Sequence, residues 1–149
     1  MADDQLAGTG HRGQVWLSTD QTAANLERIN QVKSFSIPRK LREFLETTHL
    51  DSDAKEYAPA LPDFDEFDIV FNYRPGSDTD LALEDAADDA DPRLMRLMVP
   101  VRGVLTRQIS FLCYITYAPA DEVEAQTIME STATVRVTGG ITIEPYAAP

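Results

Sequence analysis

The clearest pattern along the chain is the strict alternation of residues 66–73, which read EFDIVFNY. Phe67, Ile69, Phe71 and Tyr73 face one way, and the intervening residues face the other. A period of two predicts a β-strand with one buried face. The Pro-Gly pair that follows predicts a turn, so this strand ends abruptly.

Weaker alternation elsewhere predicts several more strands. Pro38 ends one of them, because proline cannot donate a hydrogen bond to a strand ladder. About seven strands and one helix make the chain mainly β, with a β-sandwich or small barrel, one flanking α-helix and a long loop. The further strands are predicted at 14–19, 32–37, 93–102, 108–117, 132–138 and 141–143, with Gly139-Gly140 turning the chain before the last.

The predicted flanking helix spans residues 78–90. Ser77 can cap its N-terminus, and the aspartates of its first turn favour the helix dipole. The later acids oppose the dipole, so packing must hold the helix on the sheet, through Leu81, Ala86, Ala87 and Ala90. A second, shorter helical turn is predicted within residues 22–30, where four apolar residues cluster.

The segment between residues 39 and 65 has no clear period. Residues 39–46 fit either a helix or a strand, and the extended form is favoured because the continuation is loop-like. Residues 51–65 contain Pro59 and Pro62 and predict a long loop. A structureless connection of this length is unusual in a compact domain, and long surface loops usually make contacts.

Composition adds a charge constraint. The 149 residues suit one domain, predicted over 14–143 between a flexible arm at 1–13 and a tail at 144–149. Thirteen basic against 25 acidic residues give a net charge of −12. This balance disfavours specific nucleic-acid binding, although an acidic wall would let DNA pass without adhering. No segment has the features of a signal peptide or a membrane span, and one cysteine excludes an internal disulfide.

Catalytic chemistry finds no support in the sequence, so no enzyme activity and no cofactor is expected. Neither His11 nor His49 belongs to a nucleophile motif, and Cys113 lies on an apolar strand face, which predicts an inert thiol. An EF-hand beginning at Asp78 fails at two required positions. A weak divalent-ion site within residues 63–68 stays open as an alternative to a solvated acidic surface.

One basic cluster stands out, at Arg39-Lys40-Arg42. Three cations are too few for a nucleic-acid platform. They form either a solvated stem or an electrostatic partner for an acidic surface on a second copy of the chain.

Five motifs stand out between residues 46 and 139. They are Glu46-Thr47-Thr48-His49-Leu50-Asp51-Ser52, Lys55-Glu56-Tyr57, Leu61-Pro62-Asp63, the strand 67–73 closing on Arg74-Pro75-Gly76, and Thr134-Val135-Arg136-Val137-Thr138-Gly139. Together they resemble the tail tube proteins of long, non-contractile-tailed phages, over roughly Val32 to Gly140. Ala60 departs from the glycine expected there, and residues 1–13 and 39–44 have no clear counterpart.

The resemblance implies a structural virion protein that forms hexameric rings stacked into a tube through which DNA passes. It implies tail tip, tail terminator and tape measure proteins as partners, no membrane, and assembly in the host cytoplasm. The alternatives are a monomeric β-barrel ligand-binding module and the tube subunit of a related secretion system. The resemblance assigns an inter-subunit loop to Glu46, Thr47, Thr48, His49, Asp51, Ser52, Lys55, Glu56 and Tyr57, with Glu66 and Asp68 as candidate lumen-facing acids.

Overall fold

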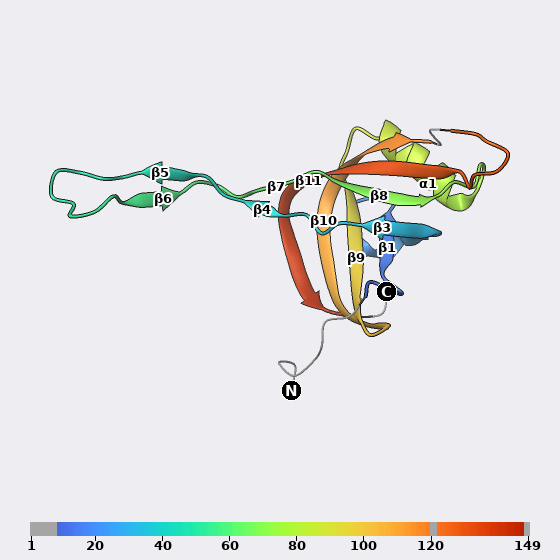
Figure 1. Ribbon diagram of the computed structural model, residues 1–149, viewed down its shortest axis with the longest axis horizontal. Helices are drawn as coiled ribbons and strands as arrows, with labels where there is room; N and C mark the ends of the chain where they lie inside the picture. The colour runs from blue at the N-terminus through green and yellow to red at the C-terminus, as the bar shows by residue number, and fades with distance from the viewer. Residues whose placement is uncertain (1–8, 120–121, 148–149) are drawn as a thin grey trace.

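The computed structural model describes residues 9–119 and 122–147, and most of their regular structure is β. Seven strands form one antiparallel sheet in the order β2-β1-β9-β10-β11-β8-β3, and two small strand pairs lie outside it (Figure 1). The mainly β class with one flanking helix is therefore confirmed. The sheet strands are β1 (Gln14–Ser18), β2 (Leu26–Ile29), β3 (Val32–Phe35), β8 (Phe67–Asn72), β9 (Arg93–Val101), β10 (Val104–Ala118) and β11 (Glu130–Pro145).

The sheet curls into a half-barrel whose two edges are neighbours in sequence. Strands β2 and β3 are separated only by Asn30-Gln31, yet they occupy opposite edges of the sheet. Gln31 takes a left-handed φ of 62°, and its carbonyl accepts the Asn72 N–H at 3.0 Å. This corner fixes where the curled sheet comes back on itself.

The core fills the concave side of the sheet. Alternation predicted this face correctly on β8, where Phe67, Ile69 and Phe71 are all buried. Phe67 meets Phe111 edge-on with ring centroids 5.8 Å apart. The other large members with almost no exposure are Val15, Leu83, Met95, Leu97 and Val135.

The helix α1 (Asp78–Asp88) lies against this core and packs on β10. The Ser77 hydroxyl accepts the Asp80 N–H, as the capping prediction required. The predicted packing face is partly wrong. Ala86 is buried, but Leu81 is half exposed and Ala87 and Ala90 are exposed, while Leu83 takes the central buried position.

Two further predictions need correction. The helical turn expected within 22–30 is limited to the 3-10 turn η2 (Ala23–Asn25), and the apolar residues after it enter β2 because pairing with β1 buries Ile29. The turn expected at Gly139-Gly140 does not exist. Strand β11 continues through the glycines, with a register shift against β10 at Phe111/Leu112 and a left-handed φ of 78° at Gly139. Glycine thus bends the strand without ending it.

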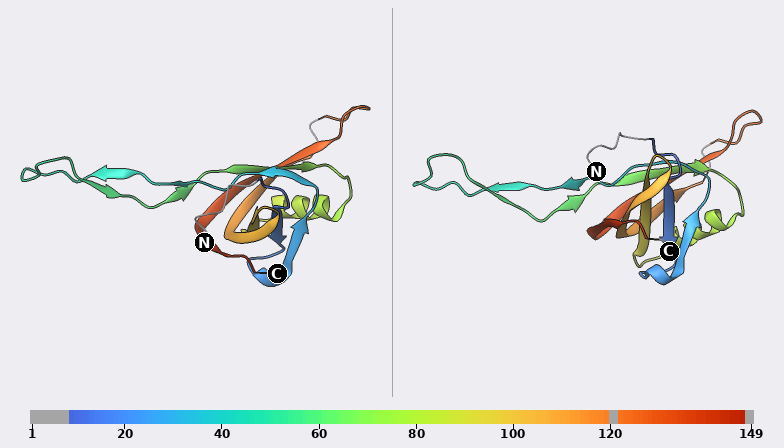
Figure 2. Two further views of the ribbon diagram at one scale, coloured as in Figure 1. Left: turned by 60° about the horizontal axis from the view of Figure 1, so that its bottom comes forward. Right: turned by 90° about the horizontal axis from the view of Figure 1, so that it is seen from below.

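The predicted loop at 51–65 is the largest difference. Residues 39–65 form a two-stranded arm, in which β4 (Lys40–Leu41) pairs with β7 (Asp63–Phe64) and β5 (Phe44–Glu46) pairs with β6 (Tyr57–Pro59). The tip, residues 47–56, and the short stretches 42–43 and 60–62 between the two strand pairs are irregular. The extended form favoured for residues 39–46 is confirmed. The arm projects away from the barrel in every view (Figure 2).

Candidate assembly surface

The arm is held together by its own backbone. The Ala60 N–H donates to the Glu43 carbonyl at 2.7 Å, and the Thr47 N–H donates to the Glu56 carbonyl at 2.8 Å. Within residues 39–63, no side chain is buried. An isolated two-stranded hairpin is marginal in water, so this one needs support from outside its own chain.

The arm also exposes an unusual amount of apolar surface. Leu50 at the tip is fully exposed, and Leu61 is 91% exposed. Clustered exposed apolar side chains mark interaction sites more often than solvated surfaces. The remaining exposed large apolar residues of the arm are Leu41, Phe44, Leu45 and Tyr57.

The predicted inter-subunit residues gather at the tip of the arm. Glu56 is their centre, because its carboxylate accepts the Ser52 hydroxyl at 3.0 Å and lies 3.4 Å from His49 Nε2. The Glu56 N–H donates to the Thr48 hydroxyl at 2.8 Å, and Ser52 also accepts the His49 N–H. These bonds shape the tip and use no group outside it.

The other predicted residues of this set flank the tip network. Glu46 and Tyr57 lie opposite each other in the β5–β6 pair, and Thr47 closes the ladder beside them. The Asp51 N–H donates to His49 Nδ1 at 3.3 Å, whereas the carboxylate of Asp51 is exposed, as is Lys55.

A charged pair joins the arm to the barrel, since Arg136 lies 3.8 Å from Asp63 of the arm and 3.7 Å from Glu66. A second pair joins the two sides of the arm at its root, where Arg39 donates to Asp65 with its Nη2 2.7 Å from the carboxylate. The pairs of Arg136 are exposed, so each contributes at most about 1 kcal/mol. The root therefore sets a direction for the arm without holding it rigidly.

The predicted lumen acids Glu66 and Asp68 lie on the outer face of the sheet, defined here as the side away from the core. Asp68 accepts the Thr134 hydroxyl at 2.8 Å, and Glu66 faces Arg136. Tyr114 pairs in register with Arg136, so this face is polar and mixed in charge.

The carboxylates considered for a divalent ion each face a partner group of the chain. Asp63 and Glu66 share Arg136, Asp65 faces Arg39, and Asp68 faces Thr134. In the part of the chain that the structure describes, no three potential ligands gather at one point. The same residues contain no helix long and apolar enough to cross a membrane.

Sequence reasoning missed two polar clusters in the body. Asp80 is buried on α1, where Oδ1 accepts the Tyr117 hydroxyl at 2.7 Å and Oδ2 accepts the Gly76 N–H at 3.0 Å. Burial, and next the bond to Asp80, raises the pKa of Tyr117 well above its usual value. This pair fastens helix to sheet. An aspartate in the first turn of a capped helix was the signal that could have suggested a special role.

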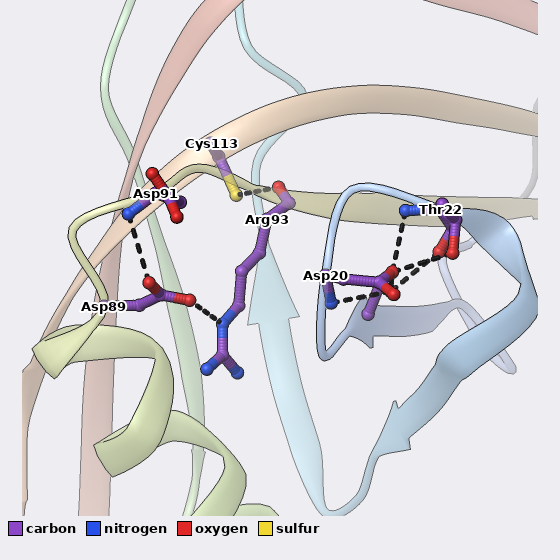
Figure 3. Close-up of polar contacts among 7 residues, drawn as sticks. Asp20, Thr22, Asp89, Asp91, Arg93 and Cys113 are labelled. Atoms are coloured by element: carbon purple, nitrogen blue, oxygen red, sulfur yellow. Dashed lines mark hydrogen bonds and ion pairs between the residues drawn. The ribbon is translucent and has the colours of Figure 1, made fainter.

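The second cluster closes the turn between β1 and β2 (Figure 3). The Asp20 carboxylate accepts the Thr22 N–H and hydroxyl, each at 2.8 Å, and also bonds Asn25 and Ser18. Led by the Thr22 N–H, these donors lower the pKa of Asp20 to about 2. Because every donor lies within residues 18–25, the cluster stabilises this turn.

Figure 3 also shows Arg93, which bonds Asp89 through its side chain and Cys113, the one cysteine of the chain, through its carbonyl. The Asp91 N–H, and next Arg93, lower the pKa of Asp89. The Cys113 thiol donates to the Arg93 carbonyl at 3.5 Å, and burial raises the pKa of Cys113 to about 12. The predicted burial of Cys113 is therefore confirmed, and a protonated buried thiol is a poor nucleophile.

Comparisons with known proteins give fold-level matches only. No family model matches the sequence, and no curated protein sequence matches it. Among solved structures, the chain is similar to a protein from the tail of an empty GTA particle, with a TM-score of 0.64, 16% identity, and 93% of this chain and 99% of that chain covered. It is also similar to the SPP1 tail tube protein, with a TM-score of 0.67, 12% identity, and 94% and 80% covered.

A third similar structure is a chain of the sheath/tube terminator of an extracellular contractile injection system. Its TM-score is 0.69 at 10% identity, with 95% of this chain and 99% of that chain covered. The three structures come from different kinds of tail-like particle, and identities this low do not separate them. The chain thus has a tail-tube-type fold, shared by tube and terminator proteins of phage tails and contractile injection systems.

Proposed function

We propose that this protein is the repeating subunit of a phage tail tube and that it assembles into hexameric rings that stack around a channel for DNA. The observation that carries the proposal is the arm at residues 39–65, which exposes apolar side chains on a tail-tube-type fold. A monomer would leave this surface in water. Contact with copies of the same chain would bury this apolar surface.

The sheet supplies a second set of unsatisfied groups. Strands β2 and β3 each pair on one side only, so each leaves free backbone donors and acceptors at an edge. Edges of this kind are aggregation hazards in a monomer and joining surfaces in an assembly. Head-to-tail contacts that close give rings, and stacked rings with no two-fold axis leave both ends open for growth.

In this assembly we place the outer face of the sheet toward the channel. Asp68 and Glu66 lie on it, and their charges act over about 8 Å at physiological salt. The overall charge of −12 favours passage of DNA over retention. The proposed partners are the tail tip, tail terminator and tape measure proteins, in a virion assembled in the host cytoplasm. The protein has no enzymatic role in this proposal.

The test is electron microscopy of the purified protein at high concentration, alone and with tail-initiation components. Rings or tubes are the expected result. Replacing the exposed Tyr57 of the arm with alanine lowers tube yield while circular dichroism stays unchanged, because the side chain has no part in the core. Absence of any ring or tube in both conditions contradicts the proposal.

A tube subunit of a related injection or secretion system is the second candidate, favoured by the similarity to the terminator of a contractile injection system. Particles isolated from the native source separate the two, because a phage tail joins a DNA-filled capsid and an injection system does not. A monomer at every concentration would instead support the ligand-binding module.

A further inference from the structure

A groove on the barrel combines positive charge with apolar walls. It runs beside the edge strand β3 and has a volume of about 550 Å³. Arg12 and His11 line one side, and Phe35, Ile37 and Val99 supply the apolar walls. In a chain with 13 basic and 25 acidic residues, a basic groove needs a specific explanation.

Of the arginine and the lysine that line this groove, only Lys33 has an acidic partner in the part of the chain that the structure describes. Within residues 9–119 and 122–147, Arg12 and the adjacent Arg102 take part in no ion pair, whereas Lys33 pairs with Glu130. The turn at Arg102-Gly103 lies against Arg12, since a Cβ on Gly103 would be 3.7 Å from Arg12 Cδ. Arg12 and Arg102 also adopt left-handed φ values of 72° and 52°. At Arg102 this conformation belongs to the two-residue loop between β9 and β10, where a left-handed φ is usual.

The tip of the arm has the complementary chemistry. Leu50 is fully exposed there, beside Asp51 and Asp53. Residues 47–56 hold three acids and one lysine, which gives −2 with His49 neutral. An apolar side chain flanked by acids matches apolar walls flanked by cations.

We propose that the groove beside β3 receives the arm tip of a second copy, with Leu50 against Phe35 and Val99 and with Asp51 and Asp53 facing Arg12 and Arg102. This docking rests on the self-assembly proposed above and names the receiving surface. The arm cannot fill its own groove in the conformation observed, because it extends away from the barrel in every view (Figure 2).

A nucleic-acid phosphate backbone fits this groove less well. It satisfies the arginines but offers nothing to the apolar walls. The contact between copies uses both halves of the groove and also leaves β3 free to pair with an added strand.

Disulfide trapping tests the docking directly. A Leu50→Cys/Ile37→Cys variant places one thiol on the tip and one at the groove, and the native Cys113 is too buried to interfere. A matched control is Leu50→Cys/Leu81→Cys, because Ile37 and Leu81 are 50% and 51% exposed. Mild oxidation gives several-fold more intermolecular cross-link in the first variant, seen as a ladder on a denaturing gel.

Charge reversal provides an independent readout. Asp51→Arg/Asp53→Arg lowers tube yield about tenfold, and adding Arg12→Asp/Arg102→Asp restores most of it. If the wild type forms tubes but the Leu50→Cys/Ile37→Cys variant cross-links no more than its control, this inference alone is overturned. If the wild type never assembles, the proposed function is overturned with it. Normal tube yield combined with lost DNA retention in Arg12→Asp/Arg102→Asp also overturns it and assigns the groove to nucleic acid.

Discussion

The barrel body and the arm are both β-structure from one chain, yet they satisfy their surfaces in different ways. The body, residues 14–38 and 66–145, buries Leu97 and Val135 completely. The arm, residues 39–65, buries only Phe64 among its large apolar side chains and leaves Leu50 wholly in water. Hydrogen bonding alone does not distinguish them, since both have paired backbones. The difference lies in apolar burial, which is the dominant favourable contribution to folding. The body can therefore fold alone, and the arm depends on what it contacts.

The largest expected effect compares one phenylalanine from each region. Phe71→Ala in the body removes a side chain that is 2% exposed and stacked on Tyr117 at 6.0 Å, so it lowers the free energy of unfolding by about 3–5 kcal/mol. Phe44→Ala on the arm, where the ring is 63% exposed, changes it by less than about 0.5 kcal/mol and reduces tube yield. Urea unfolding and sedimentation measure the two properties. Equal loss of unfolding free energy in both variants would show that the arm and the body do not differ in apolar burial as described.

A smaller effect tests how the helix is fastened to the body. Tyr117→Phe removes the hydroxyl that donates to the buried Asp80 carboxylate, so the expected loss in unfolding free energy is about 1.5–3 kcal/mol. Tyr114→Phe is the control, because that ring is 43% exposed on the outer face. Urea unfolding of both variants makes the comparison, and a loss at position 114 as large as that at 117 contradicts this role.

The smallest effect concerns pH and the turn at Asp20. The pKa of this carboxyl falls from 3.8 to about 2 on folding, so the stabilisation is complete above pH 3.8 and is lost as the pH falls toward 2. Asp20→Asn lacks this titration. Thermal unfolding at a series of pH values therefore shows a difference between wild type and variant that narrows over this window. If the stability difference between wild type and Asp20→Asn stays constant down to pH 2, the Asp20 carboxylate does not stabilise the fold in this way.

The body was largely predictable from sequence because its burial leaves a local pattern. Strand β8 alternates strictly since one face meets the core, and Ser77 has the residue type and spacing of a helix cap. Strand β2 was mistaken for a helical turn because its apolar residues also fit a helical spacing. Only pairing with β1 decides between the two, and that pairing is not local.

The sequence favoured an extended form for residues 39–46, but it did not predict that this segment pairs with residues 57–64. Its pairing of Phe44–Glu46 with Tyr57–Pro59 buries neither face within the chain, so no period of two is imposed on the residues. Gly139 and Gly140 have the composition of a turn, but pairing with β10 before and after the bend keeps β11 extended. The inter-subunit residues of the arm are a prediction from the resemblance, and the proposed receiving groove left no sequence signal, since its lining comes from distant segments.

In the proposed assembly, the arm is completed only by copies of the same chain. The decisive measurement is hydrogen exchange of the backbone amides in residues 39–65, made on dilute protein and on assembled protein. We expect fast exchange throughout the arm in dilute protein and strong protection after assembly, with β9 and β10 protected in both states. An arm already protected in the isolated chain, or still unprotected in assembled tubes, would contradict it.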